Sequence, residues 1–405
     1  MMNNWRKIKL DKILKESRET AKEQQTDKRL TVKLHLQGVH KREEKATDNI
    51  GSTVYFKRNA GQFIYGKQNL HNGAIGIIPN ELNGYQSTQD VPAFDVSEEV
   101  DVNWLYYYFA RPSFYKNLES LATGTGSKRI QPRELLKLDI LVPSLTVQKK
   151  ITEILTSVDA NIKQTEAIIE QTEQIKKGLM QQLLTKGIGH TKFKKTKIGE
   201  IPEEWELVKL EDIATVDRGR FSHRPRNDPK FYGGNIPFVQ TGDVAKAQGY
   251  LKVHSQTLNE QGLGVSKLFP KGTIIITIAA NIGETAIASY DVCFPDSLVG
   301  IIPNEDINIE FLEFYLRTRK DYLDENATES AQKNINLQVL KPLLVSLPPK
   351  NEQERIASIL KSLEKKIMLE VEKLESLSGI KKGLMQSLFT GNVRVKNDEV
   401  EVTQV

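Results

Sequence analysis

The chain has 405 residues, of which 39% are hydrophobic and 27% are charged, and its formal net charge is +5 at pH 7. This composition is typical of a globular protein, and the length predicts two to three domains with cores of their own. No apolar run reaches the roughly 18 residues of a membrane-spanning helix, and the first residues lack the apolar segment of a secretory signal. The single cysteine, Cys293, excludes an intramolecular disulfide and a cysteine-based zinc site. We therefore expect a buried thiol, a cytoplasmic location and no membrane partner.

In chain order, the composition and periodicity predict six segments. They are a mixed domain at 1–143, a long helix at 144–186, a polar and basic linker at 187–199, a second mixed domain at 200–349, a second long helix at 350–390, and a flexible polar tail at 391–405.

The first domain combines short strands with one helix. Apolar runs at 52–56, 62–66 and 73–78, separated by Gly, Asn and Pro, indicate strands. A helix is predicted at 102–119, and it must kink or break at Pro112, because proline cannot continue the backbone hydrogen bonding of a helix.

Several apolar residues are expected in the cores of the two domains. The run at 273–283 reads as a buried strand, and the aromatic residues at 106–109 and 314–315 are spaced as on a helix face, which favours packing over stacking on bases. The two domains open with related motifs, WRKIKLDKI and WELVKLEDI. We expect their tryptophans, Trp5 and Trp205, to anchor the domains.

The chain also carries an internal repeat. Residues 175–184 read IKKGLMQQLL and residues 380–389 read IKKGLMQSLF, which lie 205 positions apart (380 − 175). The same offset relates Gln148 to Gln353. A duplication without duplicated catalytic residues favours a protein that reads or bridges two similar objects.

Each long helix carries one apolar stripe at steps of three, four and seven residues. About 40 residues extend roughly 60 Å, which exceeds the width of a small domain. We therefore expect the helices to pack antiparallel as a two-stranded coiled coil, with a pseudo-two-fold relation between the domains. The alternative is that each helix packs only on its own domain. Gly178 and Gly383 interrupt both helices at equivalent positions, which indicates either a close approach of a helix or partner, or an inherited irregularity.

Motifs along nearly the whole chain support a family resemblance. They are NAGQFIYGKQNLHNGAIGII (59–78), TGTGSKRIQPRELLKLDILVPSLTVQKKI (123–151), IPEEWELVKLEDI (201–213), YGGNIPFVQTGDV (232–244), FPKGTIIITIAANIGETAI (269–287) and IKKGLMQSLFTG (380–391). With these motifs the chain resembles the specificity (S) subunit of type I restriction–modification enzymes. The first domain departs from the pattern, because it lacks the IPEEW lead and a Gly-Gly-x-Ile-Pro-Phe step.

The resemblance implies an α+β fold with two similar mixed target recognition domains, 1–143 and 200–349, separated by the two long antiparallel helices. It implies a non-catalytic subunit that reads a bipartite, asymmetric site on double-stranded DNA and directs adenine methylation and restriction by its partners. These partners would be two adenine methyltransferase (M) subunits, docked on the helices, and motor-nuclease (R) subunits. S-adenosylmethionine, ATP and Mg²⁺ would belong to the partners, and no cofactor or metal to this chain.

The sequence itself agrees with a non-catalytic role. It contains no Asn/Asp-Pro-Pro-Tyr motif, no G-x-x-x-x-G-K-[ST] phosphate loop and no HExxH motif. Two other readings stay open. The chain could be a coiled-coil scaffold whose paired domains bind proteins or other ligands, or an intrinsic nuclease, although no convincing acidic cluster supports a nuclease.

Candidate DNA contacts are basic and amide side chains in loops and at strand ends. The densest basic cluster is the loop at 217–230, which could also be merely solvated. For Lys128 and its counterpart Lys333 we favour a phosphate role over helix capping or packing. The candidates in the first domain are Lys57, Arg58, Lys67, Gln68, Asn69, Lys128 and Arg129. Those in the second domain are Arg218, Arg220, Arg224, Arg226, Gln240, Thr241, Asn281, Lys333 and Asn334.

Overall fold

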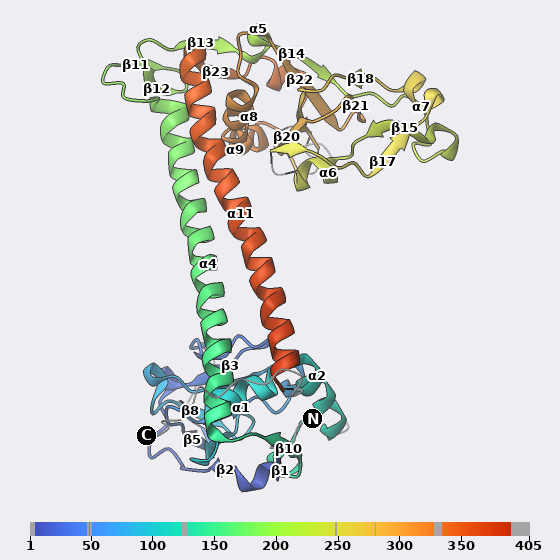
Figure 1. Ribbon diagram of the computed structural model, residues 1–405. Helices are drawn as coiled ribbons and strands as arrows, with labels where there is room; N and C mark the ends of the chain where they lie inside the picture. The colour runs from blue at the N-terminus through green and yellow to red at the C-terminus, as the bar shows by residue number, and fades with distance from the viewer. Residues whose placement is uncertain are drawn as a thin grey trace, which may run out of the picture. The chain divides into compact units, whose positions relative to one another are not determined.

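The computed structural model describes residues 5–46, 48, 51–123, 128–247, 249–279, 281–327 and 334–389. The chain divides into two compact units. Unit 1 comprises Met1–Glu166 with Glu372–Val405, and unit 2 comprises Ala167–Val371. The two long helices, α4 (Leu145–Lys186) and α11 (Lys350–Phe389), each contribute residues to both units (Figure 1).

Unit 1 contains short strands and short helices besides its parts of α4 and α11. The strands are β1 (Arg6–Lys9), β2 (Leu14–Ser17), β3 (Leu30–Val32), β4 (Val39–Lys41), β5 (Tyr55–Lys57), β6 (Phe63–Tyr65), β7 (Ile75–Ile77), β8 (Gln86–Thr88), β9 (Ala93–Val96) and β10 (Asp139–Val142). The α-helices are α1 (Val102–Phe109), α2 (Pro112–Tyr115) and α3 (Pro132–Leu135). The central sheet is antiparallel, in the order β2-β9-β6-β7, and the ladders β1-β10, β3-β4 and β5-β8 complete the unit.

The break expected at Pro112 is confirmed. Helix α1 ends at Phe109, and Pro112 is the first residue of α2. Proline fits this first position because the missing N–H would have no partner within the helix there. The expected burial of the aromatic run on α1 is confirmed for Tyr107, Tyr108 and Phe109.

The core of unit 1 is completed by both long helices. Trp104 of α1 is fully buried, and its ring lies 5.9 Å from that of Phe389 at the end of α11. Ile151 and Leu155, near the start of α4, belong to the same apolar cluster. The domain therefore packs on the start of its own helix and on the end of the other.

Unit 2 repeats this organisation with more strands. They are β11 (Phe193–Thr196), β12 (Gly199–Pro202), β13 (Glu206–Lys209), β14 (Ala214–Arg218), β15 (Tyr232–Phe238), β16 (Tyr250–Leu251), β17 (Gln256–Leu258), β18 (Leu268–Phe269), β19 (Ile274–Thr277), β20 (Thr285–Ala288), β21 (Val292–Cys293), β22 (Leu298–Pro303) and β23 (Leu344–Leu347). The α-helices are α5 (Leu210–Ile213), α6 (Thr241–Lys246), α7 (Glu260–Val265), α8 (Ile309–Arg317), α9 (Lys320–Glu325) and α10 (Leu337–Leu340). The two main sheets have the orders β14-β22-β19-β20-β16 and β17-β15-β21-β18.

Equivalent ladders in the two units reflect the sequence repeat. Strand β1 pairs antiparallel with β10, and β13 pairs antiparallel with β23, so each domain-opening motif lies beside the strand that leads into a long helix. Strand β19 is buried along its whole length, as expected for the run at 273–283. Cys293 is fully buried, as expected.

The segment at 187–199, predicted to be a polar linker, contains local structure. Strands β11 and β12 form a hairpin that extends from this segment into residue 202. Upstream of it, the buried carboxylate of Glu352 accepts hydrogen bonds from the backbone N–H of Ile188 (2.9 Å) and from the indole of Trp205 (3.0 Å), and lies 2.9 Å from the His190 ring. The sequence pattern did not reveal this hairpin, because charged, exposed Lys194, Lys195 and Glu200 interrupt its few apolar residues.

The long helices pack against each other in antiparallel direction. In unit 2, Lys176 of α4 lies 3.3 Å from Glu364 of α11, and in unit 1 Asp159 of α4 lies 2.6 Å from Lys381 of α11. A step of 17 residues forward along α4 (159 to 176) is therefore a step of 17 residues back along α11 (381 to 364). This confirms the predicted antiparallel pairing.

The predicted apolar stripes are only partly buried by this pairing. Ile175 and Ile380, both in the repeated motif, keep 49% and 50% of their surface exposed. A Cβ atom added at Gly178 or Gly383 would meet no atom within 4 Å. Close approach of the other described helix therefore does not explain these two glycines.

A buried ion-pair network joins α8 to both long helices in unit 2. Arg317 donates to Glu313, on its own helix, and to Glu364 of α11, each at 2.6 Å. Lys176 of α4 also contacts Glu364. Burial raises the pKa of Glu313 above its ordinary value, against the opposing effect of Arg317. The network holds α8 to the two long helices by charges that are largely removed from water.

Candidate nucleic-acid interface

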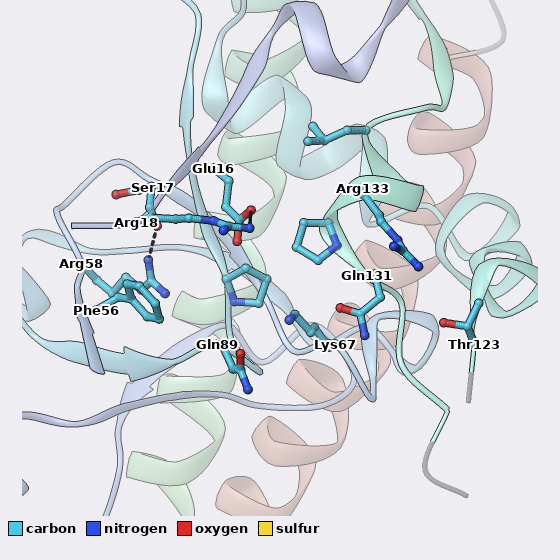
Figure 2. A pocket seen from close by; sticks show the side chains of 13 residues that line it. Glu16, Ser17, Arg18, Phe56, Arg58, Lys67, Gln89, Thr123, Gln131 and Arg133 are labelled. Atoms are coloured by element: carbon cyan, nitrogen blue, oxygen red, sulfur yellow. Dashed lines mark hydrogen bonds and ion pairs between the residues drawn. The ribbon is translucent and has the colours of Figure 1, made fainter. Parts of the chain in front are cut away.

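A basic pocket of about 540 Å³ lies beside the central sheet of unit 1. Figure 2 shows the side chains that line it. They include the cations Arg18, Arg58, Lys67 and Arg133 and one carboxylate, Glu16. Phe56, Gln89, Thr123 and Gln131 add an aromatic ring and polar groups. Cations and amides are the side chains that contact nucleic-acid phosphates and base edges.

Arg58 is buried, and its hydrogen bonds go to neutral groups of the protein. It donates to the hydroxyl of Ser87 (2.7 Å) and to the carbonyl oxygens of Ser17 (2.8 Å) and Val91 (3.2 Å). Burial lowers the pKa of Arg58 to about 10. These bonds indicate that Arg58 shapes the pocket wall, and its predicted contact with DNA stays a prediction.

Lys67 is held in the pocket wall by its backbone. Its N–H donates to the carbonyl of Asp90, and its carbonyl accepts from the N–H of Ile130, both at 2.9 Å. Only 8% of its surface is exposed. Burial lowers the pKa of Lys67, while the charges of Asp90 and Glu16 act in the opposite direction. The fixed backbone places the Lys67 side chain in the pocket wall.

The other candidates of unit 1 lie around the pocket or on the surface. Lys57 forms an exposed ion pair with Glu19, at 3.2 Å, and Arg129 forms one with Asp90, at 3.1 Å. Gln68 and Lys128 are exposed, and the Asn69 side chain accepts a hydrogen bond from Asn72. Gln68 and Asn69 follow β6 closely, as the sequence predicted, and Lys67 lies between them and the strand end.

In unit 2 the basic loop at 217–230 is organised around one acidic residue. The carboxylate of Asp296 pairs with Arg226 and, at 3.6 Å, with Arg224. Its carbonyl oxygen accepts from Arg218 at 2.7 Å. Arg220 instead donates to the carbonyl oxygen of Ser266. Three of the four arginines therefore meet at Asp296, and the charge of two of them is partly balanced by its carboxylate.

The remaining candidates of unit 2 lie at the ends of strands. Gln240 immediately precedes α6 and donates from its side chain to Gln256 (2.9 Å), and Thr241 is the first residue of that helix. Asn281 is exposed after β19, and Asn334 forms a β-bridge with Ala279. Lys333 lies outside the described residues, as do most of its loop and the predicted tail.

Sequence reasoning did not select several residues of the unit 1 pocket. Arg18 lies directly after β2, and Gln131 and Arg133 lie at the start of α3. A basic or amide residue next to a strand end is the pattern that indicated the candidates after β6. The same pattern holds for Arg18 after β2, but the sequence analysis did not select that residue. For α3, the proline at position 132 marked a helix start, but not which side chains face a pocket.

Two further observations concern metals and membranes. Within the described ranges, no group of three His, Cys, Asp or Glu side chains is placed to hold a metal ion. No described helix is long and apolar enough to cross a membrane.

Comparison with known families gives two matches along the chain. The type I restriction modification DNA specificity domain matches residues 3–174 and again residues 202–378. Among curated proteins, two from Methanocaldococcus jannaschii are each 31% identical over 355 residues. The putative type I restriction enzyme MjaX specificity subunit aligns with 86% of this chain and 79% of its own length. The type I restriction enzyme MjaVIII specificity subunit aligns with 84% and 78%.

Solved structures show the same fold. The S subunit of a type I restriction–modification system from M. genitalium superposes with a TM-score of 0.57, at 16% identity, over 97% of both chains. The HsdS subunit from Thermoanaerobacter tengcongensis gives a TM-score of 0.50, at 16% identity, over 96% of this chain and 97% of that chain.

Proposed function

Because this chain belongs to the family of type I restriction–modification specificity subunits, whose role is DNA sequence recognition, we propose that it reads one bipartite and asymmetric site on double-stranded DNA. One half-site would be read by the domain of unit 1 and the other by the domain of unit 2. Catalysis lies in other subunits of such systems. The alternative of a scaffold that binds other ligands is not favoured by these matches.

The observation that carries this proposal is a duplicated framework with different polar surfaces. The ladders β1-β10 and β13-β23 repeat, whereas the basic residues do not. Unit 1 has a pocket that contains Lys67, and unit 2 has three arginines that contact Asp296. Two related domains with different polar side chains would read two different half-sites, because base readout depends on the donors and acceptors presented.

The long helices are proposed to set the length of the unread spacer. Helix α4 has 42 residues, which corresponds to about 63 Å at 1.5 Å per residue. Successive turns of DNA are about 34–36 Å apart. Inserting four residues into α4 should therefore change the tolerated spacer, or abolish activity, without changing either half-site.

The kinds of partner follow from the family, whereas their number and their docking surface are proposals. The family implies DNA together with methyltransferase and motor-nuclease subunits as partners. We propose two methyltransferase subunits, docked on the helices, and the exposed apolar side chains of Met368 and Leu369 on α11 support such a surface. S-adenosylmethionine, ATP and Mg²⁺ would act in the partners.

Mapping methylated adenines tests the proposal directly. The chain, expressed with its methyltransferase subunit in a host without other adenine methylation, should direct methylation to one sequence made of two unequal halves. The methyltransferase expressed alone is the control and should leave this sequence unmodified. Methylation without a shared motif would contradict the proposal.

A further inference from the structure

Two glutamine side chains meet at the edge of the four-stranded sheet of unit 2. Gln256 is exposed on β17, the edge strand of this sheet, and Gln240 lies two residues beyond the end of the neighbouring strand β15 (Figure 1). The Nε2 group of Gln240 donates a hydrogen bond to Oε1 of Gln256 at 2.9 Å. An exposed glutamine ordinarily samples many rotamers. The bond from Gln240 therefore restricts an amide that faces solvent.

One carboxylate holds the backbone beside both glutamines. Asp243 accepts from the N–H of Gln240 at 2.9 Å, and it accepts from the hydroxyl (2.7 Å) and the N–H (3.3 Å) of Ser255. Ser255 directly precedes Gln256, and Val239, which directly precedes Gln240, is fully buried. A polar group that is held in this way by its neighbours is preorganised for a ligand.

The amide of Gln256 keeps both groups that recognise adenine. Its Oε1 accepts one hydrogen bond, from Gln240, and an amide oxygen has two lone pairs. Among the residues that the structure describes, none accepts a hydrogen bond from its NH₂ group. An amide that accepts from N6 and donates to N7 of adenine makes the bidentate contact that distinguishes this base in the major groove.

The position of Gln256 suits the major groove. Strands β15 and β17 pair antiparallel at the edge of the sheet, and a two-stranded ribbon is one of the elements that fit this groove. Val253, three residues before Gln256, is 76% exposed. An exposed apolar side chain in the groove is suited to contact a thymine methyl group. The segment therefore offers groups complementary to both bases of an A·T pair.

From this geometry we propose that Gln256 reads an adenine of one half-site through a bidentate contact in the major groove, with Gln240 as the residue that positions its amide. The inference rests on the proposed function, and it adds the base and the residue that recognises it. Three arginines of the basic loop already bond to Asp296, whereas the Gln256 amide keeps a donor and an acceptor for a ligand.

The test uses the full chain assembled with its methyltransferase subunit. Sequencing of methylated adenines first defines the site of the wild-type complex. Competition binding with duplexes that each replace one base pair then measures the preference at every position. Gln256→Leu removes the amide at similar size. Its preference for one A·T pair should fall by roughly 5- to 150-fold, the contribution of one bidentate contact, while the other half-site and the spacer stay unchanged.

Two further variants separate reading from positioning. Gln256→Glu keeps oxygen acceptors but loses the donor, so it should disfavour adenine at the same position and favour cytosine, whose N4 donates. Gln240→Leu leaves the reading amide in place without its support, and should lower the preference at that position by less than Gln256→Leu does. Gln261→Leu is the matched control, because Gln261 is an exposed glutamine on α7 of the same unit and should keep every preference.

The possible results separate the two proposals. If Gln256→Leu keeps the wild-type preference at every A·T pair, or lowers the affinity for all duplexes equally, Gln256 does not read adenine. If Gln240→Leu behaves as the wild type, its positioning role is wrong. If the wild-type complex methylates no bipartite site, the proposed function itself fails. Should the leucine variant be insoluble, Gln256→Thr, which favours a strand, replaces it with the same expected loss.

Discussion

Gln148 and Gln353 make the same two hydrogen bonds, 205 positions apart. The amide of Gln148 donates to the carbonyl of Pro143 (2.9 Å) and accepts from the N–H of Asp101 (2.8 Å). The amide of Gln353 donates to the carbonyl of Pro348 (2.9 Å) and accepts from the N–H of Asn308 (2.8 Å). Both glutamines are 1% exposed. In each unit, the glutamine ties the start of a long helix to the N-terminus of a domain helix, α1 or α8.

Replacing Gln353 should therefore destabilise unit 2. In Gln353→Leu the N–H of Asn308 and the carbonyl of Pro348 lose their partner, and each buried group left unpaired costs about 1–3 kcal/mol. Urea unfolding of the full chain measures the loss. Gln182→Leu is the control, since Gln182 is exposed on α4 and should change the free energy of unfolding by less than about 0.5 kcal/mol. A loss no larger than that of the control would show that the tie contributes little.

The two helix glycines should be replaceable at a gain. Gly178→Ala and Gly383→Ala should each raise the free energy of unfolding by about 1 kcal/mol, because alanine favours a helix and the added Cβ meets open space. Gly187→Ala should do the opposite. Its φ of +68° disfavours alanine, and the Cβ would lie 2.5 Å from Glu352 and 2.8 Å from Trp205. Thermal unfolding distinguishes these outcomes.

The same glycine variants also test partner docking. If a partner approaches α4 closely at Gly178, Gly178→Ala should weaken assembly with the methyltransferase subunit although it stabilises the free chain. Unchanged assembly in both variants would favour an inherited irregularity. Analytical size exclusion of the mixed subunits is a sufficient measurement.

Asp296 should limit the affinity of unit 2 for DNA. Its carboxylate pairs with Arg224 and Arg226, so Asp296→Asn releases both guanidinium groups and removes one negative charge. We expect tighter binding to a random-sequence duplex and a steeper salt dependence. Arg224→Ala should have the opposite effect, with a slope shallower by about one phosphate. If both variants bind as the wild type does, the basic loop lies away from DNA.

If Lys67 contacts DNA, as the sequence predicts, binding should depend on pH in the alkaline range. Burial lowers the pKa of Lys67; Asp90 and Glu16 oppose this shift, and Arg18 and Arg129 add to it. The ammonium should therefore lose its proton at a lower pH than an ordinary lysine, and DNA affinity should fall as the pH rises through that lowered pKa.

The pH dependence of stability should have the opposite sign. Between the lowered pKa and the ordinary pKa of lysine, the unfolded chain binds more protons than the folded one, so the free energy of unfolding should rise with pH. Both dependences should be absent from Lys67→Met and retained in Lys7→Met, because Lys7 is exposed on β1 and paired with Asp139 (3.3 Å). Equal pH profiles for the wild type and Lys67→Met would contradict this expectation.

Much of the fold could be predicted, because it depends on local or repeated patterns. The apolar stripes of α4 and α11 follow from spacing of three and four residues, and their bounds agree closely with the predicted ranges. The break at Pro112 follows from the chemistry of one residue. The hairpin β11-β12 was not anticipated, because its charged residues carry no apolar alternation.

The candidate site could be predicted only as a set of residues. Lys57, Arg58 and Lys67 are similar as basic residues near strands of the first domain, and the sequence does not rank them. The structure separates them, since Lys57 is exposed and paired, Arg58 is buried and bonded to neutral oxygens, and Lys67 is buried in the pocket wall.

The sequence by itself determined the duplication, the two long helices and the family, because these depend on residue spacing and motif order along the chain. Only the tertiary structure decided which basic side chains are already balanced. Asp296 lies 70 positions from Arg226, and Asp90 lies 39 positions from Arg129. Charge pairing and burial depend on contacts between residues that are distant in the chain, so a local pattern carries no information about them.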